Sequence, residues 1–375
     1  MRSTKAVIHL DRLSRNIAAI RAKIGPEPLI CMPVKADAYG HGAVPVALTA
    51  LEAGVRYLAV ATVDEGIELR EAGIKAPVLL LSIPLPDELP AVAAGDLSPL
   101  IGDREYAEAA GRAAGQAGKR LSVHLKVDTG MGRVGCPPEA AAELAAFIAA
   151  HPSLELAGTA THLAVADSPA EADLGYTGEQ LARFRAAVGG IRRAGIDPGL
   201  LHAANSGAVI FHKEARLDMV RPGILLYGYG APGKTPEVEP VMELVTRISF
   251  IKRVKAGETV SYGRTWTAPR DTVIATLPVG YGDGLPRRLS GNLSVRIRGG
   301  MYPLAGRICM DQCMADLGPD TDIQRWEPVT IFGGGAPSAA DLAARLGTIS
   351  YEITCGINKR VPREYRHDGN AGPAG

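Results

Sequence analysis

Short apolar runs alternate with longer alanine-rich segments through roughly the first 230 residues. In one such segment the apolar positions recur at spacings of four, three and four, on one helix face: Leu13, Ile17, Ile20 and Ile24. Asp11 is expected to cap this helix and Gly25 to end it. Farther along, Thr177 and Gln180 have the spacing of a capping box at the start of another helix.

Eight apolar and β-branched runs lie between these predicted helices. They cover residues 29–34, 57–61, 78–81, 97–101, 121–127, 154–163, 200–203 and 217–220. Strands that alternate with helices predict parallel βα units, and eight strands are the number that closes a β/α barrel. We therefore expect a (β/α)8 TIM-type barrel over residues 10–235, preceding a segment of different character.

After residue 236 the pattern changes to short alternating runs separated by glycine, proline and aspartate. This pattern predicts a mainly antiparallel β-domain over residues 236–368, with residues 1–9 as a candidate addition, so the fold class is α/β plus β. A short helix capped by Ser338 is expected within it. Residues 230–240 form the expected linker, and the polar residues 369–375 are expected to be a disordered tail.

Composition and charge narrow the class of partner. The 41 Lys and Arg against 40 Asp and Glu leave a net charge of +1, which argues against nucleic acid or an anionic membrane as partners. No run approaches the roughly 18 apolar residues of a membrane span. The five cysteines form no C-x-x-C pair and the histidines no H-E-x-x-H, so neither disulfides nor a metal is expected. A cytoplasmic location is the default expectation.

Polar residues lie at or just after the ends of the predicted strands, where a barrel places its catalytic groups. They are Lys35, Lys126, Arg133, His162, Asn205, Ser206 and Arg221. Lys35 follows an apolar strand, where its free amine would be favoured and could form a Schiff base. The alternative is a lysine that extends from the strand end into solvent. Ser206, Arg221 and Gly223 together suggest a site for a phosphorylated cofactor, although a helix cap and a surface arginine would also account for them.

Tyrosine is the commonest aromatic residue, with 11 Tyr against 5 Phe and 2 Trp. Tyr262, Tyr281 and Tyr351 stand in glycine-rich contexts of the predicted β-domain. Taken singly, each would be read as a packing residue, and Asp311 as a turn residue.

The motifs VKADAYGHG, KVDTGMGRVG, THLA, ANSGA, VRPGILLYG, VSYGRTW, GYGDG, RICMDQ and ISYEITCG occur in this order between about residues 5 and 366. Together they resemble the alanine racemases, fold-type III enzymes that use pyridoxal 5'-phosphate. The resemblance implies an isomerase that interconverts L-alanine and D-alanine, and a homodimer whose active sites combine residues of both chains.

The resemblance also implies roles for individual residues. Lys35 would hold the cofactor covalently and act as one catalytic base, and Tyr262 of the other protomer would act as the second. The implied cofactor-binding residues are Lys35, Tyr39, Arg133, His162, Asn205, Ser206, Arg221, Gly223, Ile224 and Tyr351. The implied substrate-side residues are Arg133 and, from the second protomer, Tyr281, Met310 and Asp311. Lys126 matches a position that is carbamylated in many members, where it holds the arginine in place.

Two positions depart from the family's usual sequence. Gly282 replaces the alanine of GYADG, and Gly207 stands where alanine often follows the serine. Either glycine could loosen the local backbone, which bears on substrate access more than on the reaction itself.

Other functions stay open at this level. A racemase for serine or for several amino acids would use the same fold, because a methyl pocket discriminates by only about 1–3 kcal/mol per methylene. A protein that binds pyridoxal phosphate without catalysis would explain Lys35 but not Tyr262 or Asp311. An amino-acid decarboxylase is disfavoured by Arg221, whose guanidinium would leave the cofactor's ring nitrogen unprotonated. The expected role is to supply D-alanine for peptidoglycan.

Overall fold

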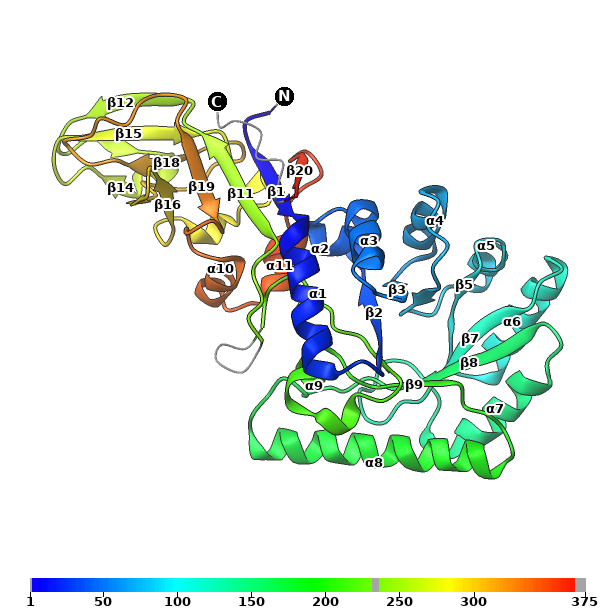
Figure 1. Ribbon diagram of the computed structural model, residues 1–375. Helices are drawn as coiled ribbons and strands as arrows, with labels where there is room; N and C mark the ends of the chain where they lie inside the picture. Colours follow the sequence, from blue (N-terminus) through cyan, green and yellow to red (C-terminus); the bar gives the residue numbers. More distant parts are fainter. Residues whose placement is uncertain (1, 231–235, 368–375) are drawn as a thin grey trace. The chain divides into compact units, whose positions relative to one another are not determined.

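A computed structural model of the protein describes residues 2–230 and 236–367 (Figure 1). The chain divides into two compact units, which we describe separately. The barrel unit comprises Leu13–Ala38 and Ala43–Val238, and the β-rich unit comprises the residues up to Arg12, Tyr39–Gly42, and the residues from Glu239 onward. The expected tail 369–375 and residues 231–235 of the expected linker lie outside the described residues.

Parallel strands alternate with helices through the barrel unit (Figure 1). The strands are β2 (Leu29–Pro33), β3 (Tyr57–Val60), β4 (Val78–Leu80), β5 (Leu97–Ser98), β6 (Leu100–Ile101), β7 (Leu121–Lys126), β8 (Leu154–Ala160), β9 (Leu200–His202) and β10 (Met219–Val220). β5 and β6 are two halves of one strand position interrupted at Pro99, which has no N–H for a strand ladder. The chain therefore has the eight strand positions that the sequence predicts.

These strands form a closed ring. Ladders join them in the orders β10-β2-β3-β4-β5 and β6-β7-β8-β9. Between β9 and β10, the Asp218 N–H donates to the Leu201 carbonyl at 3.0 Å and the Arg221 N–H to the Ala204 carbonyl at 2.8 Å. The predicted TIM-type barrel is confirmed.

Apolar side chains from six strand positions meet inside the barrel. They are Cys31, Ala59, Leu79, Leu100, Ala160 and Met219, and each is at most 3% exposed. A layer of this kind fills the interior of a β/α barrel, so polar side chains that carry function are confined to its end.

The helices of this part of the chain are α1 (Leu10–Ile24), α3 (Ala43–Glu52), α4 (Val63–Glu71), α5 (Leu89–Ala94), α6 (Arg104–Gln116), α7 (Ala141–Ala150), α8 (Glu171–Arg193) and α9 (Ser206–Phe211). The apolar face predicted for α1 is buried, and the helix ends one residue before Gly25, whose φ is +87°. No helix in the described part of the chain is long and apolar enough to cross a membrane.

Two predicted helix starts are wrong. Asp11 lies inside the first turn of α1 rather than before it. α8 begins at Glu171, six residues before Thr177, so Thr177 and Gln180 are buried within the helix. Gln180 instead accepts a hydrogen bond from the Ala164 N–H at 2.9 Å, which explains why a polar residue stands there.

The β-rich unit is built on two antiparallel sheets and a hairpin. A six-stranded sheet has the order β17 (Gly300–Pro303), β16 (Ser294–Ile297), β19 (Pro328–Phe332), β11 (Met242–Arg247), β1 (Lys5–His9) and β20 (Arg363–Arg366), with β1 and β20 parallel. The second sheet contains β12 (Phe250–Val254), β15 (Thr272–Leu277) and β18 (Cys313–Asp316), and the hairpin contains β13 (Thr259–Val260) and β14 (Trp266–Thr267). The predicted mainly antiparallel domain is confirmed.

Two helices complete this unit: α10 (Ala339–Leu346) and α11 (Ser350–Cys355). Ser338 caps α10 as predicted, and it forms a capping box with Asp341. A separate core beneath the second sheet contains Val254, Val260, Ala268, Ile274 and Ala305.

Candidate active site

Lys35 begins a helical turn of unusual handedness, α2 (Lys35–Gly40). The four residues after the lysine have φ between +52° and +54°: Ala36, Asp37, Ala38 and Tyr39. An L-residue in this left-handed region costs about 1–2 kcal/mol. Such strain persists only where the surroundings enforce it, and it is concentrated at functional sites. The rest of the fold therefore stabilises an unfavourable backbone conformation immediately after the candidate lysine.

Glu65 on α4 holds the start of this turn. Its Oε1 accepts the Ala36 N–H at 2.6 Å, and its Oε2 accepts the Ala61 N–H at 2.7 Å. Glu65 also completes a capping box with Thr62, which fixes the carboxylate relative to the helix. The sequence reasoning missed Glu65, although the T-x-x-E spacing was readable.

Arg221 lies at the end of β10 and is only 6% exposed, so it is not a surface arginine. Its Nη1 donates to His202 Nδ1 at 2.6 Å, and its Nη2 donates to the Thr161 carbonyl at 2.8 Å and to His162 Nδ1 at 3.2 Å. Burial lowers the pKa of Arg221 to about 10, so the guanidinium still carries its charge at neutral pH. Its Nε donates to none of the described residues.

A second histidine lies behind the first. His202 Nε2 is 2.8 Å from Nδ1 of His124, and both rings are fully buried. Because a guanidinium only donates, His202 Nδ1 must accept, which leaves its Nε2–H to donate to His124. Gly158 leaves room for this ring, since a Cβ there would lie 2.4 Å from His124 Nδ1. Strand-end reasoning missed both histidines because they lie within β7 and β9.

Burial and the charge of Arg221 keep these rings neutral. They lower the pKa of His124 to about 4 and that of His162 to about 3, and they place the pKa of His202 well below its ordinary value. The charges of Arg133, Lys126 and Lys35 also lower the pKa of His162. The charges of four basic residues of the barrel unit therefore act on His162.

Lys126 ends β7 and is 4% exposed, with its Nζ 2.9 Å from the Val127 carbonyl. Burial, and then the charge of Arg221, lower the pKa of Lys126 to about 8. The glycine-rich loop that follows carries the exposed Arg133, and it returns to the strand through a bridge between Val127 and Cys136.

The residues after β9 approach those after β10. Asn205, not Ser206, caps α9, because its Oδ1 accepts the Ala208 N–H at 3.0 Å. Ser206 Oγ is thereby left to accept the Leu225 N–H at 3.4 Å. This contact brings Ser206 beside the segment of Gly223 and Ile224, as a shared phosphate site requires.

Two further predicted cofactor residues meet in the β-rich unit. The rings of Tyr39 and Tyr351 pack edge to face with centroids 5.2 Å apart. Burial raises the pKa of Tyr39, so its phenol keeps its proton and can donate to an anion. Gly40 is required here because a Cβ would lie 2.2 Å from the Thr354 carbonyl oxygen.

The predicted residues of the second protomer are exposed in the β-rich unit. Tyr262 is 69% exposed, Met310 53% and Tyr281 42%. Tyr262 begins the short turn η4 (Tyr262–Arg264), which follows Ser261 at a φ of +72°. Lys35 and Tyr262 thus belong to different units of the chain.

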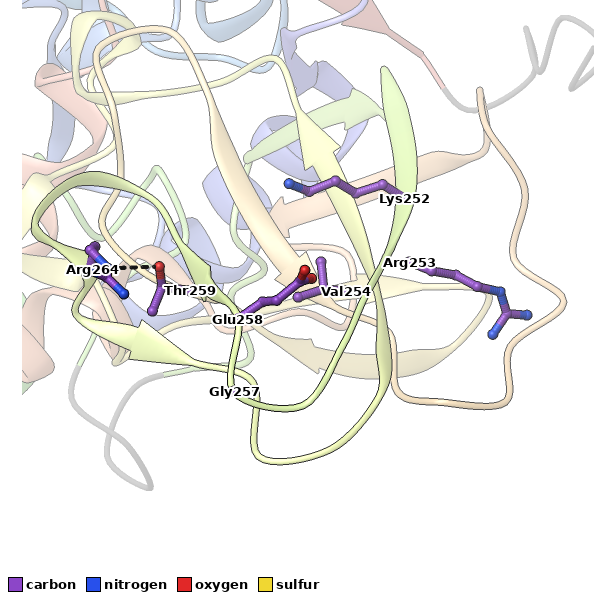
Figure 2. Close-up of a pocket in the computed structure, with 7 residues that line it drawn as sticks. All are labelled: Lys252, Arg253, Val254, Gly257, Glu258, Thr259 and Arg264. Carbon is purple, nitrogen blue, oxygen red and sulfur yellow. Dashed lines mark hydrogen bonds between the residues drawn. The ribbon is translucent and has the colours of Figure 1, made fainter.

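A polar cavity of about 530 Å³ lies nearby in the β-rich unit (Figure 2). It is lined by Lys252, Arg253, Val254, Gly257, Glu258, Thr259 and Arg264. Arg264 Nε donates to Thr259 Oγ1 at 3.2 Å at one end of this lining (Figure 2). Its lining contains none of the predicted site residues.

The fold and the strand-end residues define a β/α-barrel protein with several basic residues at the ends of its strands and an appended β-domain. Comparison with known proteins specifies the family. Residues 8–231 match the alanine racemase N-terminal domain, and residues 241–365 match the alanine racemase C-terminal domain.

Relatives that match this chain over nearly its whole length belong to the same family. The chain is 51% identical to the alanine racemase of Treponema denticola over 373 residues, covering 97% of this chain and 98% of that one. The structure matches an alanine racemase of Clostridium difficile 630 with a TM-score of 0.93 and 36% identity, covering 98% and 97% of the two chains. It also matches the alanine racemase of Bacillus anthracis with bound L-Ala-P, with a TM-score of 0.90 and 34% identity over 98% and 96%. The chain belongs to the alanine racemase family.

Replacing Glu65 by glutamine should destabilise the turn after Lys35. A glutamine has only one side-chain oxygen, so its NH2 group would face either the Ala36 or the Ala61 N–H and leave that donor without an acceptor. We expect a loss of about 2 kcal/mol in the free energy of unfolding. Urea unfolding measures the loss. Glu68→Gln on the exposed face of the same helix is the control and should change little. Equal stability of the two variants would contradict the role given to Glu65.

The buried histidines should make stability fall in acid. The unfolded chain binds protons below about pH 6.5, whereas folded His124 and His162 resist protonation down to about pH 4 and 3. Stability present above pH 6.5 is therefore lost as the pH falls toward 4, by about 1.4 kcal/mol per pH unit for each histidine. Urea unfolding of the protein and of His124→Asn between pH 7 and pH 4.5 tests this, and the variant should have the shallower slope. Identical slopes would mean that His124 titrates normally.

Proposed function

We propose that this protein racemises alanine with pyridoxal 5'-phosphate, in a homodimer whose active sites each use residues of both chains. The proposal is carried by the buried Arg221, which donates to the neutral His162, and by the charges of Lys35, Lys126 and Arg133, which act on the same histidine. A cluster of cations at the end of a barrel favours an anionic ligand. Family membership supports alanine as the substrate.

The residues present fit this cofactor. The Lys35 amine would attach it, and the phenol of Tyr39, the Ser206 hydroxyl and the backbone of Gly223 and Ile224 would donate to its phosphate. The ring of Tyr351 packs on that of Tyr39. Arg221 has an Nε–H that no described residue accepts, which suits an unprotonated ring nitrogen. Bound pyridoxal phosphate supplies an electron-withdrawing ring that makes the α-proton of alanine acidic.

Arg221 would direct the outcome of the reaction. Its pKa of about 10 means that it holds its proton at neutral pH and acts only as a donor. The ring nitrogen opposite Arg221 would therefore stay unprotonated, and the cofactor's ring would withdraw electrons less strongly than a ring whose nitrogen is protonated. This weaker withdrawal favours rapid return of a proton over decarboxylation. Serine or broader racemase activity remains compatible with the same residues.

Racemisation requires bases on both faces of the α-carbon. Lys35 would serve one face, and the exposed Tyr262 of the partner subunit would serve the other. A phenol is a weak base until a neighbour stabilises its anion. His162 can do so: its Nδ1 accepts from Arg221, which leaves its Nε2–H as a donor toward a phenolate.

Lys126 is suited to carbamylation. With a pKa of about 8, an appreciable share of its amine is unprotonated at neutral to mildly alkaline pH and can add carbon dioxide. The resulting carboxylate would give Arg133, whose charge acts on this lysine, an anionic partner in the barrel. In the cell, the proposed role is cytoplasmic supply of D-alanine for peptidoglycan.

Lys35→Ala should abolish covalent capture of the cofactor. Borohydride treatment should fix pyridoxal phosphate to the wild-type protein and not to the variant, as read by mass spectrometry. Lys75→Ala, which changes an exposed lysine, is the control. Cofactor fixed to the Lys35 variant would remove Lys35 from its proposed role.

Mixing two inactive variants should restore activity if the sites are composite. Lys35→Ala and Tyr262→Phe each damage every site of their own homodimers, but a mixed dimer has one site with both native residues. After subunit exchange at equal amounts, we expect about a quarter of wild-type racemase activity. Activity no higher than that of the separate variants would place both residues in one chain's site.

Loss of one base should slow proton removal from one enantiomer of alanine more than from the other. Tyr262→Phe is expected to slow α-proton exchange into deuterated water more from L-alanine than from D-alanine, as measured by NMR. Equal loss from both enantiomers would contradict the assignment of faces.

A further inference from the structure

Arg360 joins a buried carboxylate to the loop that carries two of the proposed substrate-side residues. It lies between α11 and β20 in the β-rich unit. Its Nε donates to Asp283 Oδ1 at 2.7 Å, and its Nη2 donates to Asp311 Oδ1 at 2.8 Å. The same Nη2 also donates to the Met310 carbonyl at 3.3 Å.

Asp283 is a fixed anchor for this arginine. Its side chain is fully buried, Arg2 pairs with Oδ1 at 2.5 Å, and the Gly280 N–H donates to Oδ2 at 2.9 Å. Burial alone would raise the pKa of Asp283, but hydrogen bonds from Arg2, Gly280 and Arg360 lower it. The anchor is therefore ionised, and it holds one end of the Arg360 guanidinium at a buried carboxylate.

A glycine turn leaves the space in which this guanidinium lies. In η5 (Tyr281–Asp283), the Tyr281 N–H donates to the Cys309 carbonyl at 3.0 Å and the Gly282 N–H to the Met310 carbonyl at 2.8 Å. A Cβ on Gly282 would lie 2.5 Å from Nη2 of Arg360. An alanine at this position, as in GYADG, would therefore force the arginine to move. The glycine that replaces the family's usual alanine at position 282 therefore makes room for the Arg360 guanidinium.

We propose that Arg360 is a positioning residue that fixes Met310 and Asp311 for substrate binding, and that Gly282 is the residue that permits it. The inference rests on the proposed function, in which both residues would lie on the substrate side of the partner's site, as the family resemblance implies. The side chain of Asp311 is 62% exposed. An unpaired carboxylate there would repel the carboxylate of alanine, and the guanidinium of Arg360 both neutralises it and holds it in one place.

Arg2 supplies a control, because it binds the same Asp283 oxygen and the backbone carbonyl of Arg360, whereas none of its described hydrogen bonds or ion pairs goes to Met310 or Asp311. We expect Arg360→Met to raise KM for alanine about tenfold with a smaller change in kcat. Arg2→Met should lower the melting temperature with KM unchanged, and Arg360→Lys should give an intermediate KM. Equal changes of KM in the Arg2 and Arg360 variants, or no change in either, would overturn the proposal.

Gly282→Ala tests the same contact without removing the arginine. It should raise KM in the same direction as Arg360→Met by displacing the guanidinium. Gly178→Ala, at a helical glycine with open space around it, is the control and should leave KM unchanged. Wild-type KM in Gly282→Ala would show that the close approach is unimportant.

A readout independent of activity separates this inference from the proposed function. Hydrogen exchange of peptides covering residues 279–285 and 306–316 should speed up in Arg360→Met and stay unchanged in Arg2→Met. If the wild-type protein fails to racemise alanine, the proposed function fails, and faster exchange still shows that Arg360 positions the loop. Unchanged exchange in Arg360→Met would overturn the positioning role whatever the activity.

Discussion

The candidate site is organised by one buried positive charge that has no carboxylate among its hydrogen-bond partners. Arg221 donates to two histidine nitrogens and to the carbonyls of Thr161 and Ala203, all of them neutral. Burying an uncompensated ion costs several kcal/mol, so the charge acts strongly on its surroundings. It contributes to lowering the pKa of His124, His162, His202 and Lys126. The neutral histidines and the lowered pKa of Lys126 therefore share the same two causes, burial and this charge.

A second constraint acts on the backbone. The left-handed turn after Lys35 would be unfavourable in isolation, yet the carboxylate of Glu65 binds its first N–H and Asp37 binds the Ala43 N–H at 2.9 Å. The strain places Lys35 at the end of β2 in one position, and the same turn continues to the buried Tyr39. Electrostatics set the chemistry of the site, whereas local strain sets the position of the lysine that would perform it.

The sequence predicted the barrel well because its signals are local and repeated. Each strand was marked by a short apolar run, and α1 by the spacing of four side chains. Helix starts were less predictable: Thr177 and Gln180 have the capping pattern, but the acidic turn at Glu171 extends α8 before them. Glu65, His124, His202 and Arg360 escaped prediction because their roles depend on contacts with residues distant in the sequence. Pattern reasoning finds groups at strand ends and overlooks those that support them.

The β-rich unit explains why the chain is longer than a barrel alone. It has its own core around Ile274 and Ala305, so its exposed loops can be held rigidly without help from the barrel. Tyr262, Tyr281 and Met310 are exposed in this unit, where the partner chain of the proposed dimer would cover them. Buried Asp283 gives Arg360 a fixed attachment beneath that surface. The physical logic is the same in both units: a buried charge holds a neighbouring group in place, as Arg221 holds the histidines of the barrel and Asp283 the arginine that contacts Asp311.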